Sequence, residues 1–205
     1  YAPSFEAAEK INTRLGWIGN LKSDGRPIIG LDSKELLKII LENPGAALIP
    51  AHAWTPWFGI FGSMSGFNSL EECFDELTPH VFAIETGLSS DPAMNWRISW
   101  LDVVAIMSSS DAHSLHRLGR EACVFDIEPS YSAVMDAIKT SDSKKFLFTT
   151  EFYPEEGRYH YSGHSAHEVV YSPQQEKERK AICEACGKPV TRGVMSRVEE
   201  LADKA

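Results

Sequence analysis

The sequence predicts an α/β fold followed by a small C-terminal module. Over residues 1–155, short apolar runs typical of buried strands alternate with segments that carry helix-start signals. Beyond about residue 155 these runs vanish, and Gly, His, Tyr and charged residues take their place. Because alternating strands and helices favour a largely parallel sheet, we expect one α/β domain over 1–155 and a separate module over 156–205.

Local patterns define the expected elements. D-S-K-E at 32–35 resembles a capping box and opens a helix with apolar residues between 36 and 41, which Asn43-Pro44-Gly45 stops. S-L-E-E at 69–72 is a second capping box, whose helix is expected to reach about Leu77. Turn signals occur at 23–25. The remaining expected elements are helices at 95–102 and 131–139, and strands at 46–51, 81–84, 103–107, 122–125 and 145–150.

The composition excludes several classes of protein. With 43% hydrophobic and 24% charged residues, the 205-residue chain is not disordered as a whole. A net charge of -9 argues against binding nucleic acid mainly through a broad basic surface. No apolar run is long enough for a membrane-spanning helix. The chain starts at Tyr1 without the features of a signal peptide and ends within a helical pattern, so we expect a fragment of a longer cytoplasmic protein.

Polar side chains follow three successive strands of the predicted sheet. His52 follows the first strand, Glu85 the second, and Asp111 and His113 the third. The C-terminal ends of parallel strands share one face, where the active sites of such folds lie. His, Asp and Glu are good ligands for divalent metals such as Zn or Mn. The sequence therefore predicts a metal site at this face, in which Glu85 is a ligand, a carboxylate that orients a ligand, or a helix cap.

Three long motifs carry a family resemblance: P-A-H-A-W-T-P-W-F at 50–58, I-E-T-G-L-S-S-D-P-A-M-N-W-R at 84–97 and S-D-A-H-S-L-H-R-L-G-R-E-A at 110–122. They resemble the PHP (polymerase and histidinol phosphatase) superfamily, and within it the branch that contains endonuclease Q. The resemblance implies a distorted (β/α)7 barrel that holds up to three ions of Zn, Mn or Mg and hydrolyses phosphoesters. Endonuclease Q nicks DNA on the 5′ side of deaminated bases and abasic sites.

The resemblance also implies roles for the strand-end residues. Asp111 and His113 match the D-x-H metal motif of the family, and His52 matches its single metal-ligand His on an earlier strand. We expect Asp111, His113 and Glu85 to be catalytic, in a site where metal ions polarise the phosphate and activate water. The H-x-H motif of the family is absent before His52, so we expect the C-terminal portion of a barrel, inactive alone, or a degenerate relative that never held the site.

Cationic and aromatic residues near these motifs are candidates for binding substrate. Arg117 and Arg120 follow the D-x-H turn and are expected to contact phosphate, or else to pair with surface acids. Trp54 and Trp57 belong to the aromatic, glycine-rich segment 54–67, where glycines give a loop backbone freedom. Their rings would stack on an extruded base, or else pack in the core of the barrel mouth.

The tail predicts a zinc module. Cys183-x-x-Cys186-Gly has the form of a zinc knuckle, and His164 and His167 precede it with helical spacing. His160 and His164 are alternatives for the fourth ligand. A redox pair is the other interpretation, although no thioredoxin-like strand precedes the cysteines. Cys73 and Cys123 are expected to be inert core thiols.

Three functions compete. The first is a metal-dependent phosphodiesterase, most concretely a DNA-repair endonuclease acting on deaminated bases or abasic sites. The second is a non-catalytic, zinc-containing fragment that binds DNA or serves as a scaffold. The third is a phosphatase of small phosphomonoesters, which would have no use for a DNA-contacting module.

The net charge of the chain is a weak argument against a DNA-binding enzyme. Clustered metal ligands make a site acidic until metal ions bind there.

Overall fold

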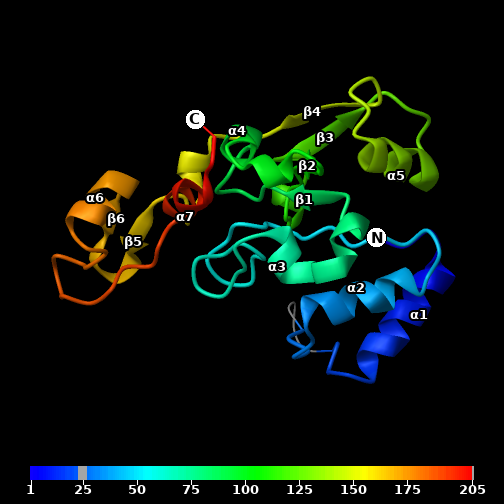
Figure 1. Cartoon of the computed structure of the whole chain (residues 1–205), viewed down its shortest axis with the longest axis horizontal. Coiled ribbons are helices and arrows are strands. Elements are labelled where there is room, and N and C mark those ends of the chain that lie inside the picture. The colour runs from blue at the N-terminus through cyan, green and yellow to red at the C-terminus, as the bar shows by residue number, and fades with distance from the viewer. Residues whose placement is uncertain (23–26, 205) are drawn as a thin grey trace.

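The computed structural model describes residues 1–22 and 27–204, so the turn predicted at 23–25 lies outside the described residues. Within the described part, no helix is both long and apolar enough to span a membrane. Figure 1 shows the C-terminal module with α6, β5 and β6 at one end, and α1 and α2 at the other. The α-helices are α1 Phe5–Gly16, α2 Ser33–Leu41, α3 Leu70–Phe74, α4 Pro92–Trp96, α5 Tyr131–Thr140, α6 Pro173–Glu178 and α7 Val194–Leu201. The strands are β1 Ala83–Glu85, β2 Ala105–Met107, β3 Ala122–Phe125, β4 Phe146–Thr150, β5 Ser162–His164 and β6 Val169–Tyr171.

The predicted parallel arrangement holds for one strand pair. β1 and β2 are parallel, with Ala83 opposite Ala105, at the positions predicted for the second and third strands. The run at 46–51, predicted as a strand, lies beside β1 without forming a ladder. The Glu85 amide donates to the Pro50 carbonyl and the Ala53 amide to the Glu85 carbonyl, each at 3.0 Å. Pairing stops there because proline has no amide hydrogen and the chain turns at the next residues.

β3 and β4 occur where predicted, but they pair antiparallel, which corrects the expectation of a largely parallel sheet. The reason lies in α5, which connects them. Met135 and Ile138 of α5 pack against Ala83 and Ala105 of the first strand pair. After α5 the chain returns along β3 as β4, and the two strands run in opposite directions, as Figure 1 shows. β5 and β6 form a third, antiparallel pair in the module.

Most predicted helices are present with changed lengths. α2 begins at the predicted capping box, where Asp32 caps its N-terminus, and ends before the predicted stop at 43–45. α3 starts at its capping box but ends at Phe74, and a 3₁₀ turn, Asp75–His80, follows it. The helix expected at 95–102 is split into α4 and a short 3₁₀ turn. α1, which was not predicted, is capped by Ser4 and has no fully buried side chain, so it lacks the apolar face that marked the others.

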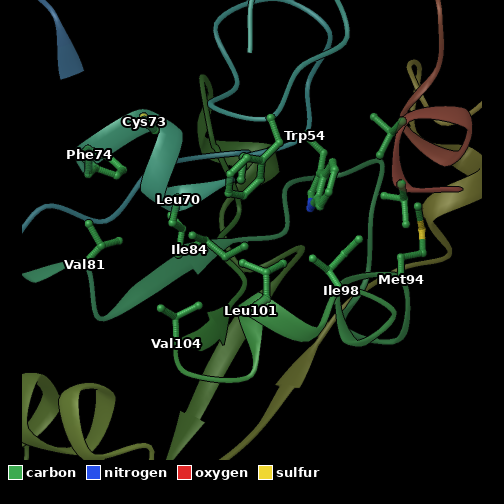
Figure 2. Close-up of a cluster of buried hydrophobic side chains, with 14 of the residues drawn as sticks. Trp54, Leu70, Cys73, Phe74, Val81, Ile84, Met94, Ile98, Leu101 and Val104 are labelled. Atoms are coloured by element: carbon green, nitrogen blue, oxygen red, sulfur yellow. The ribbon is translucent and has the colours of Figure 1, made fainter. Parts of the chain in front are cut away.

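The main core lies between α3, β1, α4 and α7. Figure 2 shows Trp54, Leu70, Ile84 and Ile98 pointing into one cluster. Two residues of α7, Val194 and Val198, complete this core although they lie within the predicted C-terminal module, after its cysteines in sequence. α7 ends at Leu201, before the helical pattern of the sequence does. Through α7 the chain returns from the module to the main core, which positions the module against the aromatic segment.

Candidate metal centre and nucleic-acid site

Four side chains of the C-terminal module converge on one point. One ligand atom from each of His164, His167, Cys183 and Cys186 lies within 4.8 Å of all the others. His164 Nδ1 is 3.2 Å from His167 Nδ1 and 3.4 Å from Cys186 Sγ, and His167 Nδ1 is 3.7 Å from Cys183 Sγ. A tetrahedral zinc ion with ordinary bond lengths has N–N edges of about 3.3 Å and N–S edges of about 3.6 Å. The donor set and its spacing therefore fit zinc.

The backbone beside the two cysteines has the tight turn of a zinc knuckle. The Gly187 amide donates to the Cys183 carbonyl, and the Cys183 amide donates to the Lys188 carbonyl, each at 2.8 Å. Gly187 has a φ of 69°, which costs glycine little and most other residues much more. The core behind the knuckle is small: Cys183 packs with Tyr171 and Val190. Because so small a core supplies little hydrophobic stabilisation, we expect the module to depend on its metal.

The converging group contains His164 and not His160. His160 is buried, its Nδ1 lies 3.0 Å from the Ser89 carbonyl oxygen, and its ring meets Tyr161 edge-on. His160 therefore joins the start of the module to the loop that follows β1.

The residues predicted at the strand ends are placed in two pairs. The Glu85 carboxylate accepts a 2.7 Å hydrogen bond from the His52 amide, and His52 Nδ1 lies 3.1 Å from the Thr55 hydroxyl. Asp111 Oδ1 and His113 Nδ1 lie 3.8 Å apart. Asp111 lies in a turn with a φ of 44°, and its side chain and that of His113 lie on the same side of this turn. Throughout residues 1–22 and 27–204, three or more metal-binding side chains converge in the C-terminal module alone, so the strand-end metal site stays a prediction.

Two buried carboxylates near this face were missed by the sequence reasoning. Glu121 precedes β3 and Glu151 follows β4, and the antiparallel register places them opposite each other. Burial raises the pKa of Glu121 to about 7, although its hydrogen bond from the Ser108 hydroxyl, at 3.0 Å, opposes the rise. Burial also raises the pKa of Glu151, although hydrogen bonding with the Thr149 and Thr86 side chains opposes the rise. In the sequence each of these glutamates directly flanks a predicted strand. That pattern indicates a pair of neighbouring carboxylates only once the antiparallel pairing of the two strands is known.

The aromatic segment is packed, not free. Trp54 is 1% exposed, and its indole N–H donates to the buried Asn95 at 2.7 Å, so its faces are covered by protein. Trp57 is 40% exposed and meets Tyr159 edge-on at 5.9 Å. The glycines of the aromatic segment allow close packing of the backbone. At Gly62, for example, a Cβ would lie 2.2 Å from a backbone oxygen. Of the two tryptophans predicted to contact a base, Trp57 alone offers an accessible ring.

The two arginines after the D-x-H motif differ in their surroundings. Arg120 Nε donates to the Ser110 carbonyl at 2.7 Å, so this side chain braces the base of the loop. Arg117 is exposed at the tip of the loop, on a 3₁₀ turn. In the described part of the chain neither pairs with an acidic side chain, which leaves Arg117 open to a phosphate.

No family model matches the chain. Two solved structures are similar to it over 99% of its length. One is the lesion-specific endonuclease PfuEndoQ from Pyrococcus furiosus, with 28% identity and a TM-score of 0.83. The other is endonuclease Q in complex with a 27-mer duplex substrate with an abasic lesion at the active site, with 27% identity and a TM-score of 0.87. The chain has an endonuclease Q-like fold. It spans about half of each of these chains, 50% and 51%.

Two curated relatives match at lower coverage of their own length. An uncharacterized protein of Methanocaldococcus jannaschii is 32% identical over 160 residues, which are 74% of this chain and 19% of that protein. The uncharacterized protein YqxK of Bacillus subtilis is 32% identical over 166 residues, 80% of this chain and 41% of YqxK. The resemblance to endonuclease Q carried by the three motifs is thus confirmed as a similarity of structure.

Proposed function

We propose that the chain is part of a metal-dependent DNA-repair endonuclease, which nicks duplex DNA on the 5′ side of a deaminated base or an abasic site. The observation that carries this proposal is the similarity to endonuclease Q over 99% of the chain, including a structure with lesion-bearing DNA at its active site. In this proposal residues 1–155 are part of a PHP-type barrel, and residues 156–205 form a zinc module that contacts the barrel and DNA.

Within the proposed barrel site, Asp111 and His113 supply two neighbouring donor atoms. In the described part of the chain no third metal-binding side chain joins them, so these residues do not by themselves form a complete metal site. A barrel metal (Zn, Mn or Mg) requires further ligands, for which His52 and Glu85 remain the proposed candidates.

The DNA-binding part of the proposal rests on the residues around Trp57. A cavity of about 460 Å³ lies between the aromatic segment and the module, lined by Trp57, Tyr159 and Tyr161. The Arg158 guanidinium lies over the Tyr159 ring, 5.6 Å from its centroid. Exposed aromatic rings bind unpaired bases by stacking, and an abasic or mismatched position is easily opened. We propose that Trp57 stacks on a base of the opened duplex and that Arg117 contacts a phosphate.

One observation favours a second function, a non-catalytic zinc-containing DNA-binding protein. The metal cluster that the described residues assemble is the His and Cys group of the module, whose composition is that of a structural site. The two functions differ in whether DNA is cut.

Nicking of defined duplexes tests the proposal. The protein in its full natural length is incubated with Mn²⁺, Mg²⁺ or Zn²⁺ and an end-labelled duplex that carries one uracil, one hypoxanthine or one abasic-site analogue. We expect a single metal-dependent nick 5′ of the lesion, which Asp111→Ala abolishes. Asp126→Ala, a change at an exposed aspartate after β3, is the matched control and should cut normally.

Two results decide between the alternatives. Intact DNA with every metal and every lesion, together with tight binding, would support the non-catalytic function and refute the endonuclease. Equal cutting by the Asp111→Ala variant would refute the assignment of the site.

A further inference from the structure

Two leucines at the tip of the loop at 111–120 are exposed to an unusual degree for large apolar residues. The exposed fraction is 83% for Leu115 and 66% for Leu118. The Leu118 amide donates to the Leu115 carbonyl at 3.3 Å, closing a 3₁₀ turn. In such a turn side chains three residues apart lie one above the other. The two leucines therefore form one continuous apolar projection.

The base of this loop is held by short hydrogen bonds. The Ser110 hydroxyl accepts from the Gly119 amide at 2.8 Å and donates to the Glu121 carbonyl at 3.1 Å. Arg120 Nε donates to the Ser110 carbonyl at 2.7 Å. These bonds join the two ends of the loop to each other. The leucines are thus presented on a preorganised turn, which loses little conformational entropy when it binds a partner.

The surroundings of the leucines are cationic. Residues 112–120 contain two arginines and two histidines and no acidic residue, in a chain whose net charge is -9. The exposed Arg117 side chain forms no ion pair among the residues that the structure describes. The acidic groups closest along the chain are Asp111, at the base of the loop, and Glu121, which is buried. An apolar projection within a positive segment fits an anionic partner that contains an apolar gap.

We propose that Leu115 and Leu118 form a wedge that enters the DNA duplex at the damaged position, while Arg117 holds the adjacent phosphate. This inference rests on the proposed function. Leucine side chains inserted between base steps unstack them, and nearby cations neutralise phosphates. An abasic site offers a gap where one base is missing, so the wedge fills it without first breaking a base pair. The wedge thus contributes to lesion preference, separately from Asp111 and His113.

The test compares lesion and undamaged DNA. The full-length protein, without added divalent metal, is titrated into a duplex with an abasic-site analogue beside 2-aminopurine, and into the matched undamaged duplex. We expect the Leu115→Ala/Leu118→Ala variant to lose about tenfold in affinity for the lesion duplex and to lose the rise in 2-aminopurine fluorescence. Its affinity for undamaged DNA should change less than about twofold. The control Val103→Ala changes another apolar residue, 79% exposed, and should leave both affinities as they are.

Arg117→Ala provides an independent arm. This variant should bind both duplexes more weakly, by a similar factor. The slope of log K against log salt concentration should fall in magnitude by about one, because one fewer counterion is released.

Three results would overturn the wedge. They are lesion binding by the double variant equal to wild type, an equal loss for both duplexes, and a lower melting temperature, which would show that the leucines are covered by protein. A wild-type protein that nicks lesion DNA while the double variant matches it refutes the wedge and leaves the proposed function standing. A wild-type protein with no lesion preference and no nicking refutes the proposed function.

Discussion

Replacing Cys183 by serine should remove zinc from the C-terminal module. Cys183 is 0% exposed, and its Sγ is one of the four converging ligand atoms. Structural zinc sites contribute about 10–16 kcal/mol, so losing one of four ligands should cost about a quarter, roughly 3 kcal/mol. That is about a hundredfold in zinc affinity. Because Cys183 also belongs to the small core with Tyr171 and Val190, the module should open when the metal leaves.

Zinc content and protease sensitivity measure this effect. The wild-type chain is expected to keep one zinc ion per molecule after dialysis against a competing chelator, and the Cys183→Ser variant to lose it. Trypsin should then cut the variant within the module. Cys123→Ser is the matched control, because Cys123 accepts a hydrogen bond from the Ser108 amide at 3.3 Å and lies outside the cluster. Full zinc retention by the Cys183→Ser variant would refute the assignment of the ligands.

Three further predictions concern stability. Trp54→Ala should lower the free energy of unfolding by about 3–5 kcal/mol and Trp57→Ala by less than about 1 kcal/mol in urea denaturation, because the first ring is buried and the second half-exposed; equal losses would contradict the packing. Burial raises the pKa of Glu121 from 4.5 to about 7, so the folded protein binds this proton more tightly than the unfolded chain, and stability should fall as pH rises between these values. Glu121→Gln should remove that fall in stability and stabilise the protein at pH 8 by up to about 3 kcal/mol. The control Glu128→Gln, at an exposed site, should leave the fall unchanged. Melting temperatures measured from pH 5 to 8 test both expectations. Gly62→Ala should lower the free energy of unfolding by about 1–3 kcal/mol, because the new Cβ would lie 2.2 Å from the Thr55 carbonyl oxygen. An unchanged melting temperature would contradict this close packing.

Local patterns predicted elements well and their pairing poorly. The strands at 122–125 and 145–150 occur within a residue of the expected positions, since runs of apolar and β-branched residues mark them directly. Their antiparallel direction depends on α5, which packs against Ala83 and Ala105. Residues far apart in the sequence make that contact, so no local window contains it.

The candidate site shows the same division. Glu121 directly precedes β3 and Glu151 directly follows β4, and the β3–β4 register places them opposite each other. Trp54 and Trp57 are three residues apart with similar neighbours in sequence, and tertiary packing alone distinguishes the buried ring from the accessible one.

By itself the sequence determined the Cys-x-x-Cys motif of Cys183 and Cys186, the histidines available to it as metal ligands, and the resemblance to endonuclease Q. Metal-ligand spacing and motif strings are short-range, so they can be read without a fold. Only the tertiary structure decided that His164 belongs to the cluster while His160 is buried against Ser89. Which side chains converge depends on how β5 and the knuckle pack across a gap of nearly twenty residues, and chain connectivity does not encode that distance directly.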